Sequence, residues 1–150
     1  MAVHTGAMIT IKETATTPRP RPEVFAYVAD FTTAAEWDPG IRSSVRVGGD
    51  GGVGSRYEVG ATFAGRVVPM IYEVIEHTVP GRIVLRGVAT SVEALDAISF
   101  EEAPGGGTRV GYRADFTLKG GLRHVAFLMK PLFGRLGRKA IGGLQAALNR

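Results

Sequence analysis

The sequence of 150 residues contains no cysteine. Disulfide bridges, thiol nucleophiles and thiolate metal sites are therefore excluded. The three histidines, His4, His77 and His124, do not form a metal-binding motif such as HxxxH or HExxH. No serine lies in a nucleophile-elbow pattern, and GGDGGVG lacks the lysine and the following helix of a phosphate loop. The sequence thus predicts a protein that holds no metal and uses no cofactor.

Long apolar runs are also missing, since no stretch approaches the roughly 20 residues that span a bilayer. The start, MAVHTGAMIT, has neither the charged nor the apolar region of a signal peptide. A cytoplasmic location fits these absences, although the lack of cysteine also fits other compartments. The length suits one domain, and we expect a mobile tail over residues 1–7 followed by a single domain over 8–150.

Acidic residues are absent from the last stretch, RHVAFLMKPLFGRLGRKAIGGLQAALNR (123–150), which mixes apolar and basic side chains. Pro131 should kink a helix in this stretch or mark its effective start. The glycines of this stretch lower helix stability by roughly 1 kcal/mol each relative to alanine, so the helix needs a packing partner. Apolar residues at three- and four-residue spacing predict its buried stripe: Val125, Met129, Leu132, Leu136, Ala140, Leu144 and Ala147, widened by Phe133, Ile141 and Leu148.

Short alternating apolar runs, separated by turn signals such as Gly105-Gly106-Gly107, fill the middle of the chain. Their hairpin-length links indicate an antiparallel sheet. Between the first two strands, Pro22 and Asp38-Pro39-Gly40 delimit two short helices. The predicted strands cover residues 8–17, 41–47, 53–63, 67–77, 83–88, 91–101 and 108–118.

One sheet and one amphipathic helix must bury their apolar faces against each other. The predicted fold class is therefore α+β. A curved, seven-stranded antiparallel sheet wraps around a long C-terminal helix, and two short helices lie between strands 1 and 2. A sheet curled around a helix can leave an internal cavity that is lined by inward side chains.

The order of elements and several stretches of sequence resemble the helix-grip fold of the START-related (SRPBCC) superfamily. This superfamily includes polyketide cyclases and dehydratases and lipid-transport proteins. The resemblance spans about residues 9–148 and implies the fold, but no single activity, because the fold hosts both enzymes and carriers. The stretches that carry it are PRPEVFAYVADFTTAAEWDPGIRSS, YEVIEHTVPGRIVLRG, DAISFEEAPGGGTRVGYRADF and PLFGRLGRKAIGGLQAAL.

Strand alternation predicts which side chains face the cavity. The strand over 67–77 is apolar on both faces, so its orientation stays open; Met70 and Tyr72 are placed inward because Glu73 would otherwise be buried. Trp37, the single tryptophan, plugs one end of the core or lines the cavity mouth. The predicted lining comprises Trp37, Tyr57, Met70, Tyr72, Arg86, Asp96, Ile98, Tyr112, Phe116, Met129, Leu132 and Phe133.

Asp96 is the candidate site residue with the strongest physical argument, because a carboxylate on an inward face costs free energy unless it is paired. Three interpretations stay open. Asp96 accepts a hydrogen bond from a tyrosine or pairs with an arginine, it acts as a general acid or base, or a one-residue strand shift exposes it. The candidate catalytic residues are Asp96, Tyr112 and His124, which begins the last helix. Arg86 binds a ligand carboxylate or phenolate, or it pairs with Glu93.

The leading functional prediction is a carrier or sensor for a small hydrophobic ligand, such as a polyketide, an aromatic compound or a lipid-like molecule. The alternative that the resemblance implies is a cofactor-independent cyclase or dehydratase using Asp96 and a cavity tyrosine. A third hypothesis is a protein-interaction module that uses the outer face of the sheet. No nucleic-acid partner is predicted, because no helix-turn-helix is present and the arginines are spread along the chain. The basic helix leaves room for transient membrane contact, and the oligomeric state stays open.

Overall fold

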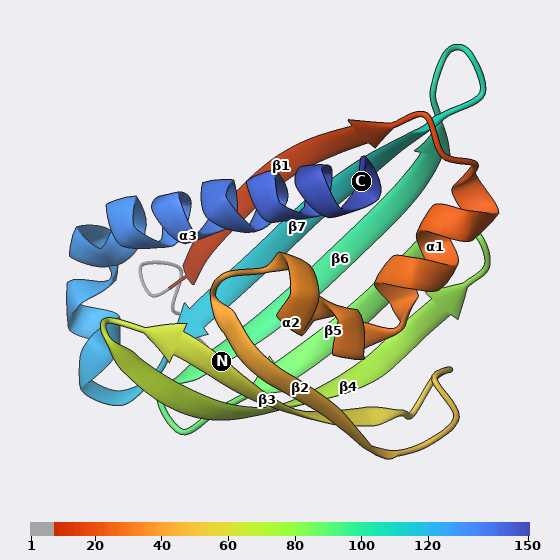
Figure 1. Ribbon diagram of the computed structural model, residues 1–150. Helices are drawn as coiled ribbons and strands as arrows, with labels where there is room; N and C mark the ends of the chain where they lie inside the picture. The colour runs from red at the N-terminus through yellow and green to blue at the C-terminus, as the bar shows by residue number, and fades with distance from the viewer. Residues whose placement is uncertain (1–7) are drawn as a thin grey trace.

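The computed structural model describes residues 8–150, so the tail predicted over residues 1–7 lies outside the described residues. Seven strands form one antiparallel sheet in the order β1-β7-β6-β5-β4-β3-β2 (Figure 1). The sheet and the C-terminal helix confirm the predicted helix-grip fold. The strands are β1 (Met8–Thr17), β2 (Ile41–Gly48), β3 (Arg56–Phe63), β4 (Arg66–Thr78), β5 (Arg82–Val88), β6 (Val92–Glu102) and β7 (Thr108–Leu118).

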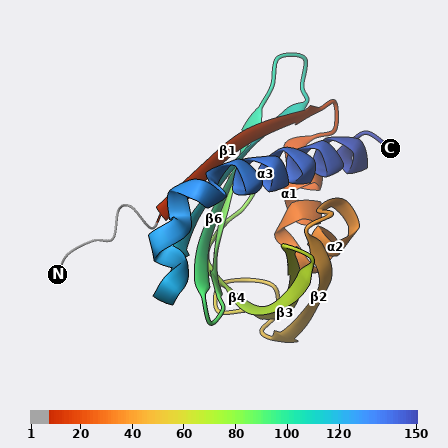
Figure 2. The same ribbon diagram turned by 90° about the vertical axis from the view of Figure 1, so that its left-hand side faces the viewer.

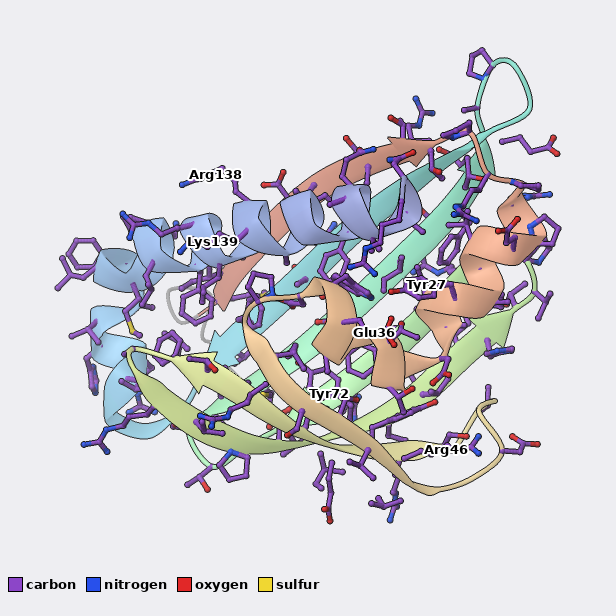
Figure 3. All side chains as sticks on the ribbon, in the orientation of Figure 1. Tyr27, Glu36, Arg46, Tyr72, Arg138 and Lys139 are labelled. Atoms are coloured by element: carbon purple, nitrogen blue, oxygen red, sulfur yellow. The ribbon has the colours of Figure 1, made fainter. Side chains whose placement is uncertain are left out.

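Short helices connect β1 to β2, as the sequence predicts. They are α1 (Arg21–Ala29), the 3-10 turn η2 (Phe31–Thr33) and α2 (Ala34–Trp37). Pro22 lies in the first turn of α1, where its missing N–H costs no hydrogen bond. Tyr27 of α1 donates a hydrogen bond to Glu36 of α2 over 2.9 Å, which ties the two helices together (Figure 3).

The C-terminal helix begins later than predicted. A 3-10 segment, η3 (Gly120–Val125), precedes α3 (Ala126–Leu148), and Pro131 lies inside α3. η3 and the light-blue first turns of α3 run at an angle to the remainder of the helix (Figure 2). Arg138 lies on the outer side of the helix (Figure 3). The buried residues of α3 are Ala126, Phe133, Leu144 and Leu148, and the last three belong to the predicted stripe. Val125, also predicted on the stripe, is exposed and precedes α3.

The sheet curls because bulges interrupt its register. Register shifts lie between Ile41 and Ser43, between Arg46 and Gly48, and between Val74 and Glu76. A bulge bends its strand and increases the local twist. The curled sheet leaves a concave side, and α3 lies across the opening (Figure 2).

Two glycines let α3 approach its neighbours closely. A Cβ atom at position 137 would overlap the side chain of Ile11 on β1, and one at position 143 would overlap the backbone carbonyl of Trp37 at the end of α2. The helix end is also held by hydrogen bonds, because Gln145 accepts from the N–H of Thr16 over 2.9 Å and donates to the carbonyl of the same residue. The close approaches explain why glycine, despite its low helix propensity, occupies positions 137 and 143 of α3.

The burial of side chains resolves the orientation of β4 that the sequence leaves open. Met70, Tyr72 and Val74 are buried on the concave side, whereas Ile71 and Ile75 are exposed on the outer side. The concave face, α1, α2 and the second half of α3 enclose the main core. None of the described helices is long and apolar enough to cross a membrane.

Candidate ligand-binding cavity

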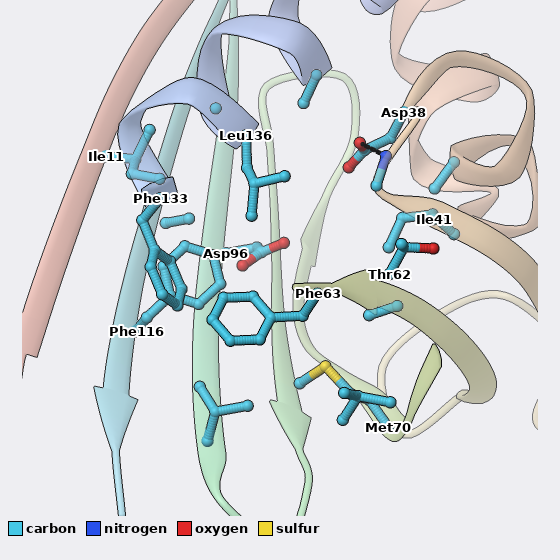
Figure 4. Close-up of a pocket in the computed structure, with 18 of the residues that line it drawn as sticks. Ile11, Asp38, Ile41, Thr62, Phe63, Met70, Asp96, Phe116, Phe133 and Leu136 are labelled. Atoms are coloured by element: carbon cyan, nitrogen blue, oxygen red, sulfur yellow. Dashed lines mark hydrogen bonds between the residues drawn. The ribbon is translucent and has the colours of Figure 1, made fainter. Parts of the chain in front are cut away.

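A partly enclosed cavity lies between the concave face of the sheet, α3 and the connection from α2 to β2 (Figure 4). The centres of water-sized molecules can occupy a volume of about 130 Å³ within the cavity. A single water needs roughly 10–15 Å³ by the same measure. The wall is mainly apolar. Phe133 of α3 closes one part of it by packing, with tilted rings, against Phe63 at 5.2 Å and Phe116 at 4.8 Å between ring centroids. This space suits a small organic molecule rather than a single water.

Several residues of the predicted lining do border this cavity: Trp37, Met70, Tyr72, Asp96, Tyr112, Phe116 and Phe133. They come from α2, β4, β6, β7 and α3, which are far apart in the chain and meet only through the sheet order. Period-two alternation is the signal that brings the strand residues to one side.

Other residues of the predicted lining do not border the cavity. Tyr57 is buried beneath Phe31, with ring centroids 5.8 Å apart, and Ile98 is fully buried in the core. Met129 and Leu132 are partly buried on α3 but do not border the cavity, and Met129 packs against the small core cluster that contains Phe133. An inward side chain thus reaches the cavity only where no other residue covers it.

Arg86 and His124 are placed wrongly by the sequence. Arg86 is exposed on the outer face of β5, where its cross-strand neighbours are Glu73 and Leu95. The predicted pairing of Arg86 with Glu93 is also wrong, since Glu93 forms its ion pair with Lys119 over 3.4 Å. His124 is exposed in η3, outside the cavity, so it cannot act on a molecule held there.

Asp96 is the buried carboxyl of the cavity, with 3% of its surface exposed. β6 and β7 pair antiparallel with Ile98 opposite Tyr112, which places the Tyr112 ring diagonally across from Asp96. The Tyr112 hydroxyl donates a hydrogen bond to Asp96 Oδ2 over 2.6 Å, whereas Oδ1 has no partner among the described residues. Burial raises the pKa of Asp96 to about 7, the Tyr112 hydrogen bond lowers it in part, and the nearby charge of Asp38 raises it further.

Asp38 is a cavity residue that sequence reasoning missed. It follows Trp37 at the end of α2, and its Oδ1 accepts a hydrogen bond from the N–H of Gly40 over 2.8 Å. Burial raises its pKa to about 6, although the Gly40 hydrogen bond opposes the shift. Asp38 and Asp96 lie on different walls of the cavity (Figure 4). In the sequence, the turn signal Asp38-Pro39-Gly40 indicated only the end of a helix. Asp38 reaches the cavity through tertiary packing, which a local turn signal does not reveal.

Two further polar groups face the cavity. Tyr72 packs against Phe31 at 5.0 Å between centroids, and its ring lies over Gly87, where a Cβ would come within 2.5 Å of the ring carbon Cζ. Trp37 is buried, and its Nε1–H has no hydrogen-bond partner among the described residues. Burial strongly raises the pKa of the Tyr72 hydroxyl, so it stays a neutral donor.

The described residues that line the cavity include acidic but no basic side chains. None of the described residues that line it is a lysine, arginine or histidine, whereas Asp38 and Asp96 both do line it. Within residues 8–150, no group of three histidine, aspartate or glutamate side chains is placed to hold a metal ion. The cavity therefore offers carboxyl acceptors and neutral donors such as the Trp37 N–H, in apolar surroundings.

The sequence matches the family model described as "Polyketide cyclase / dehydrase and lipid transport" over residues 8–149. The chain belongs to this family. The match covers every described helix and strand, so the cavity lies within the region that defines the polyketide cyclase/dehydrase and lipid-transport family. No curated protein matches the sequence significantly.

Solved structures support the fold of this family member. The ZhuI aromatase/cyclase from Streptomyces sp. R1128 superposes with a TM-score of 0.80 and 13% identity, covering 94% of this chain and 93% of that one. A START superfamily protein from Mycobacterium smegmatis gives a TM-score of 0.79 and 15% identity, with 93% and 96% covered. Ara h 8.0201 gives a TM-score of 0.60 and 20% identity, with 93% and 99% covered. At these identities the likeness establishes the fold.

Proposed function

We propose that this protein is a carrier or sensor for a small, neutral, mainly apolar molecule that bears a hydroxyl group and a second oxygen. The observation that carries the proposal is Asp96 Oδ1, a buried acceptor without a partner among the described residues that borders an apolar cavity. A buried polar atom without a hydrogen bond costs free energy, and a ligand hydroxyl would remove that cost. The family, with its description of polyketide cyclases and lipid transport, supports a hydrophobic ligand of this kind.

A second polar group of the cavity can bind the other oxygen of the ligand. Trp37 Nε1–H is a buried donor that borders the same cavity, so it suits a ligand carbonyl or ether oxygen. An anionic ligand does not suit the site, because its charge would be buried near Asp38 and Asp96 without a lining cation. A hydroxyl-bearing aromatic or polyketide-like molecule fits these constraints, and a free fatty acid does not.

Isothermal titration calorimetry with three naphthalene derivatives tests the ligand class. We expect 2-naphthol to bind, 2-methoxynaphthalene to bind more weakly because it lacks the donor for Asp96, and 2-naphthoate to bind at least about tenfold more weakly than 2-naphthol. Equal affinity for all three compounds would contradict the assigned hydrogen bond to Asp96 and the exclusion of anions.

A matched pair of variants on α3 tests the location of binding. Ala140 borders the cavity and Ala146 is exposed on the same helix. Ala140→Leu should fill part of the cavity and abolish 2-naphthol binding, whereas Ala146→Leu should leave it unchanged. If Ala140→Leu bound 2-naphthol as well as the unaltered protein does, the ligand would lie elsewhere.

The two carboxyls with raised pKa also favour a second function, an enzyme of the cyclase or dehydratase type. An ionised Asp96, whose pKa lies near 7, would take the proton from the carbon beside a ketone and then, as the protonated carboxyl, give it to a departing hydroxyl, which leaves as water. The nearby Asp38 helps to keep that pKa raised. The name of the ZhuI aromatase/cyclase, a structural neighbour, adds support. The other groups of the cavity would hold the substrate in a reactive geometry.

Deuterium exchange separates the enzyme from the carrier. The neutral ketone 2-tetralone, incubated in D₂O with the protein, should lose protons beside its carbonyl faster than in buffer if Asp96 acts as a base. Asp96→Asn should remove this acceleration while 2-naphthol affinity persists, because asparagine retains an acceptor oxygen. The enzyme hypothesis fails if wild type and Asp96→Asn exchange at the same rate, and the carrier then remains.

A further inference from the structure

Two adjacent apolar side chains project from the first turn of α3. Phe127 is 68% exposed, the highest value for any large hydrophobic residue among the described part of the chain, and Leu128 is 65% exposed. Their neighbour Ala126 is buried against the small core cluster that contains Ile11 and Phe133. The turn is thus anchored on one side, and its folded conformation presents Phe127 and Leu128 to the surroundings.

Two basic residues flank this pair in the chain. Arg123 and Lys130 are exposed on either side of it, and neither forms an ion pair within residues 8–150. The sequence has no acidic residue after Asp115, so no carboxylate of η3 or α3 offsets these charges. We call Arg123, Phe127, Leu128 and Lys130 the α3 patch. Its combination of projecting apolar tips and unpaired cations is complementary to a surface with negative headgroups over an apolar interior.

The shape of the region favours a lipid surface over a protein. η3 and the first turns of α3 form a corner at one end of the molecule (Figures 1 and 2). A stable protein interface buries about 800 Å² on each partner over a broad, complementary area. Two neighbouring side chains on a corner do not supply such an area, whereas they can insert into the headgroup region of a bilayer.

The α3 patch lies beside the wall of the cavity. Leu122 and Phe133, which flank the patch in the chain, both border the cavity. Phe133 also contacts Phe63, at the end of β3. A bilayer in contact with the patch would therefore lie close to the side chains that close this part of the cavity.

We propose that the protein docks on anionic bilayers, with Phe127 and Leu128 inserted among the lipids and Arg123 and Lys130 bound to the headgroups. Docking places the aromatic wall of Phe63, Phe116 and Phe133 near the lipid, where a hydrophobic molecule can enter without crossing bulk water. Only this last consequence rests on the proposed ligand-binding function, since docking itself needs no ligand.

Vesicle flotation with the full chain tests docking without any ligand. We expect the protein to float with vesicles made of equal parts phosphatidylcholine and phosphatidylglycerol, and to remain unbound with phosphatidylcholine alone. Added salt should release it, because exposed charges are screened. Equal binding to both vesicle types, or binding to neither, would overturn the proposal.

Matched variants separate the α3 patch from a general surface effect. The double variant Phe127→Ser/Leu128→Ser should weaken binding at least about tenfold. The control Ile71→Ser/Val88→Ser alters residues of the outer sheet face that are 43% and 42% exposed, and it should bind as wild type does. Arg123→Gln/Lys130→Gln should weaken binding by roughly fivefold per cation, whereas Arg42→Gln/Arg46→Gln, with the same loss of charge, should have little effect.

Insertion is measured separately from attachment. Phe127→Trp adds an indole to a protein whose single native tryptophan, Trp37, is 3% exposed. Brominated lipids in the anionic vesicles should quench the added fluorescence and leave that of the wild type unchanged. An absence of quenching would overturn insertion. If Phe127→Ser/Leu128→Ser lowered the mass of the assembly in solution without changing vesicle binding, the α3 patch would serve self-association, and docking would be overturned.

Discussion

The carboxyl of Asp96 makes folding depend on pH. Its pKa is raised to about 7 in the folded protein from an ordinary value of 3.8, and that of Asp38 is raised to about 6. Between the ordinary and the raised values, the folded state keeps protons that the unfolded state has released. The free energy of unfolding therefore falls as pH rises from about 4 to about 7 and changes little from these groups above that range.

Replacing Asp96 by asparagine should remove most of this dependence. Near about pH 8 we expect Asp96→Asn to be more stable than wild type by a few kcal/mol, because a tenfold difference in proton affinity between the folded and unfolded protein corresponds to roughly 1.4 kcal/mol. Near about pH 4 the difference should disappear. Urea unfolding followed by circular dichroism measures both, and Glu58→Gln, at an exposed position, controls for the loss of one negative charge. An equal effect at both pH values would contradict the assigned protonation.

The Tyr112 hydroxyl partly offsets the effect of burial on Asp96. Because its hydrogen bond favours the ionised form, Tyr112→Phe should raise the pKa of Asp96 above its value of about 7. The ¹³C chemical shift of the carboxyl carbon, followed through a pH titration, reports this change. Tyr27→Phe removes a comparable hydrogen bond, to Glu36, and should leave the Asp96 titration unchanged. A downward shift in Tyr112→Phe would show that the hydroxyl does not stabilise the carboxylate.

At the level of single residues, strand alternation brings Asp96 and Tyr112 to one side, since the period of two holds wherever the strand limits are right. The inward prediction for Arg86 was wrong although alternation holds around it, since Leu85 and Gly87 are buried whereas Arg86 and Val88 are exposed. Alternation cannot show that Tyr57 is covered by Phe31, which depends on a contact between distant parts of the chain.

At the level of elements, α3 is held by close approach at its second half. Gly143 lies against the backbone carbonyl of Trp37, whereas its neighbour Gly142 is exposed with no atom near the position of a Cβ. Gly143→Ala should destabilise the protein by about 1–3 kcal/mol, because a backbone group must move. Gly142→Ala should stabilise it by up to about 1 kcal/mol, because alanine has the higher helix propensity.

Urea unfolding of the two variants measures these opposite changes in stability. The fluorescence of Trp37 provides a second readout, since displacement of α3 changes the surroundings of the indole in Gly143→Ala alone. Equal stabilities in the two variants would mean that α3 does not pack against α2 as described.

The positions of the helices could be predicted only in part. Amphipathic spacing predicts a C-terminal helix that packs on the sheet and buries Phe133 and Leu144, but it wrongly places Val125 on the buried stripe. The close contacts of Gly137 and Gly143, which join α3 to β1 and α2, were not predicted. Spacing within one helix carries no information about such partners.

At the level of the whole molecule, one sheet and one principal core predict a single unfolding unit. Thermal unfolding followed by far-ultraviolet circular dichroism and by Trp37 fluorescence should give coincident transitions. The first signal reports the sheet and helices, and the second reports the packing of α2 against α3. Two separate midpoints would show that the helical cover opens before the sheet and that the predicted single domain is wrong.

The pairing of β1 with β7 has a consequence for the order of assembly. The strands from β2 to β7 each pair with the next along the chain, whereas Met8 of β1 lies opposite Thr117 of β7. During synthesis β1 has no partner until β7 emerges about a hundred residues later. Until then β1 and the apolar face meant for α3 stay uncovered, so nascent chains halted before β7 should be the ones that chaperones retain.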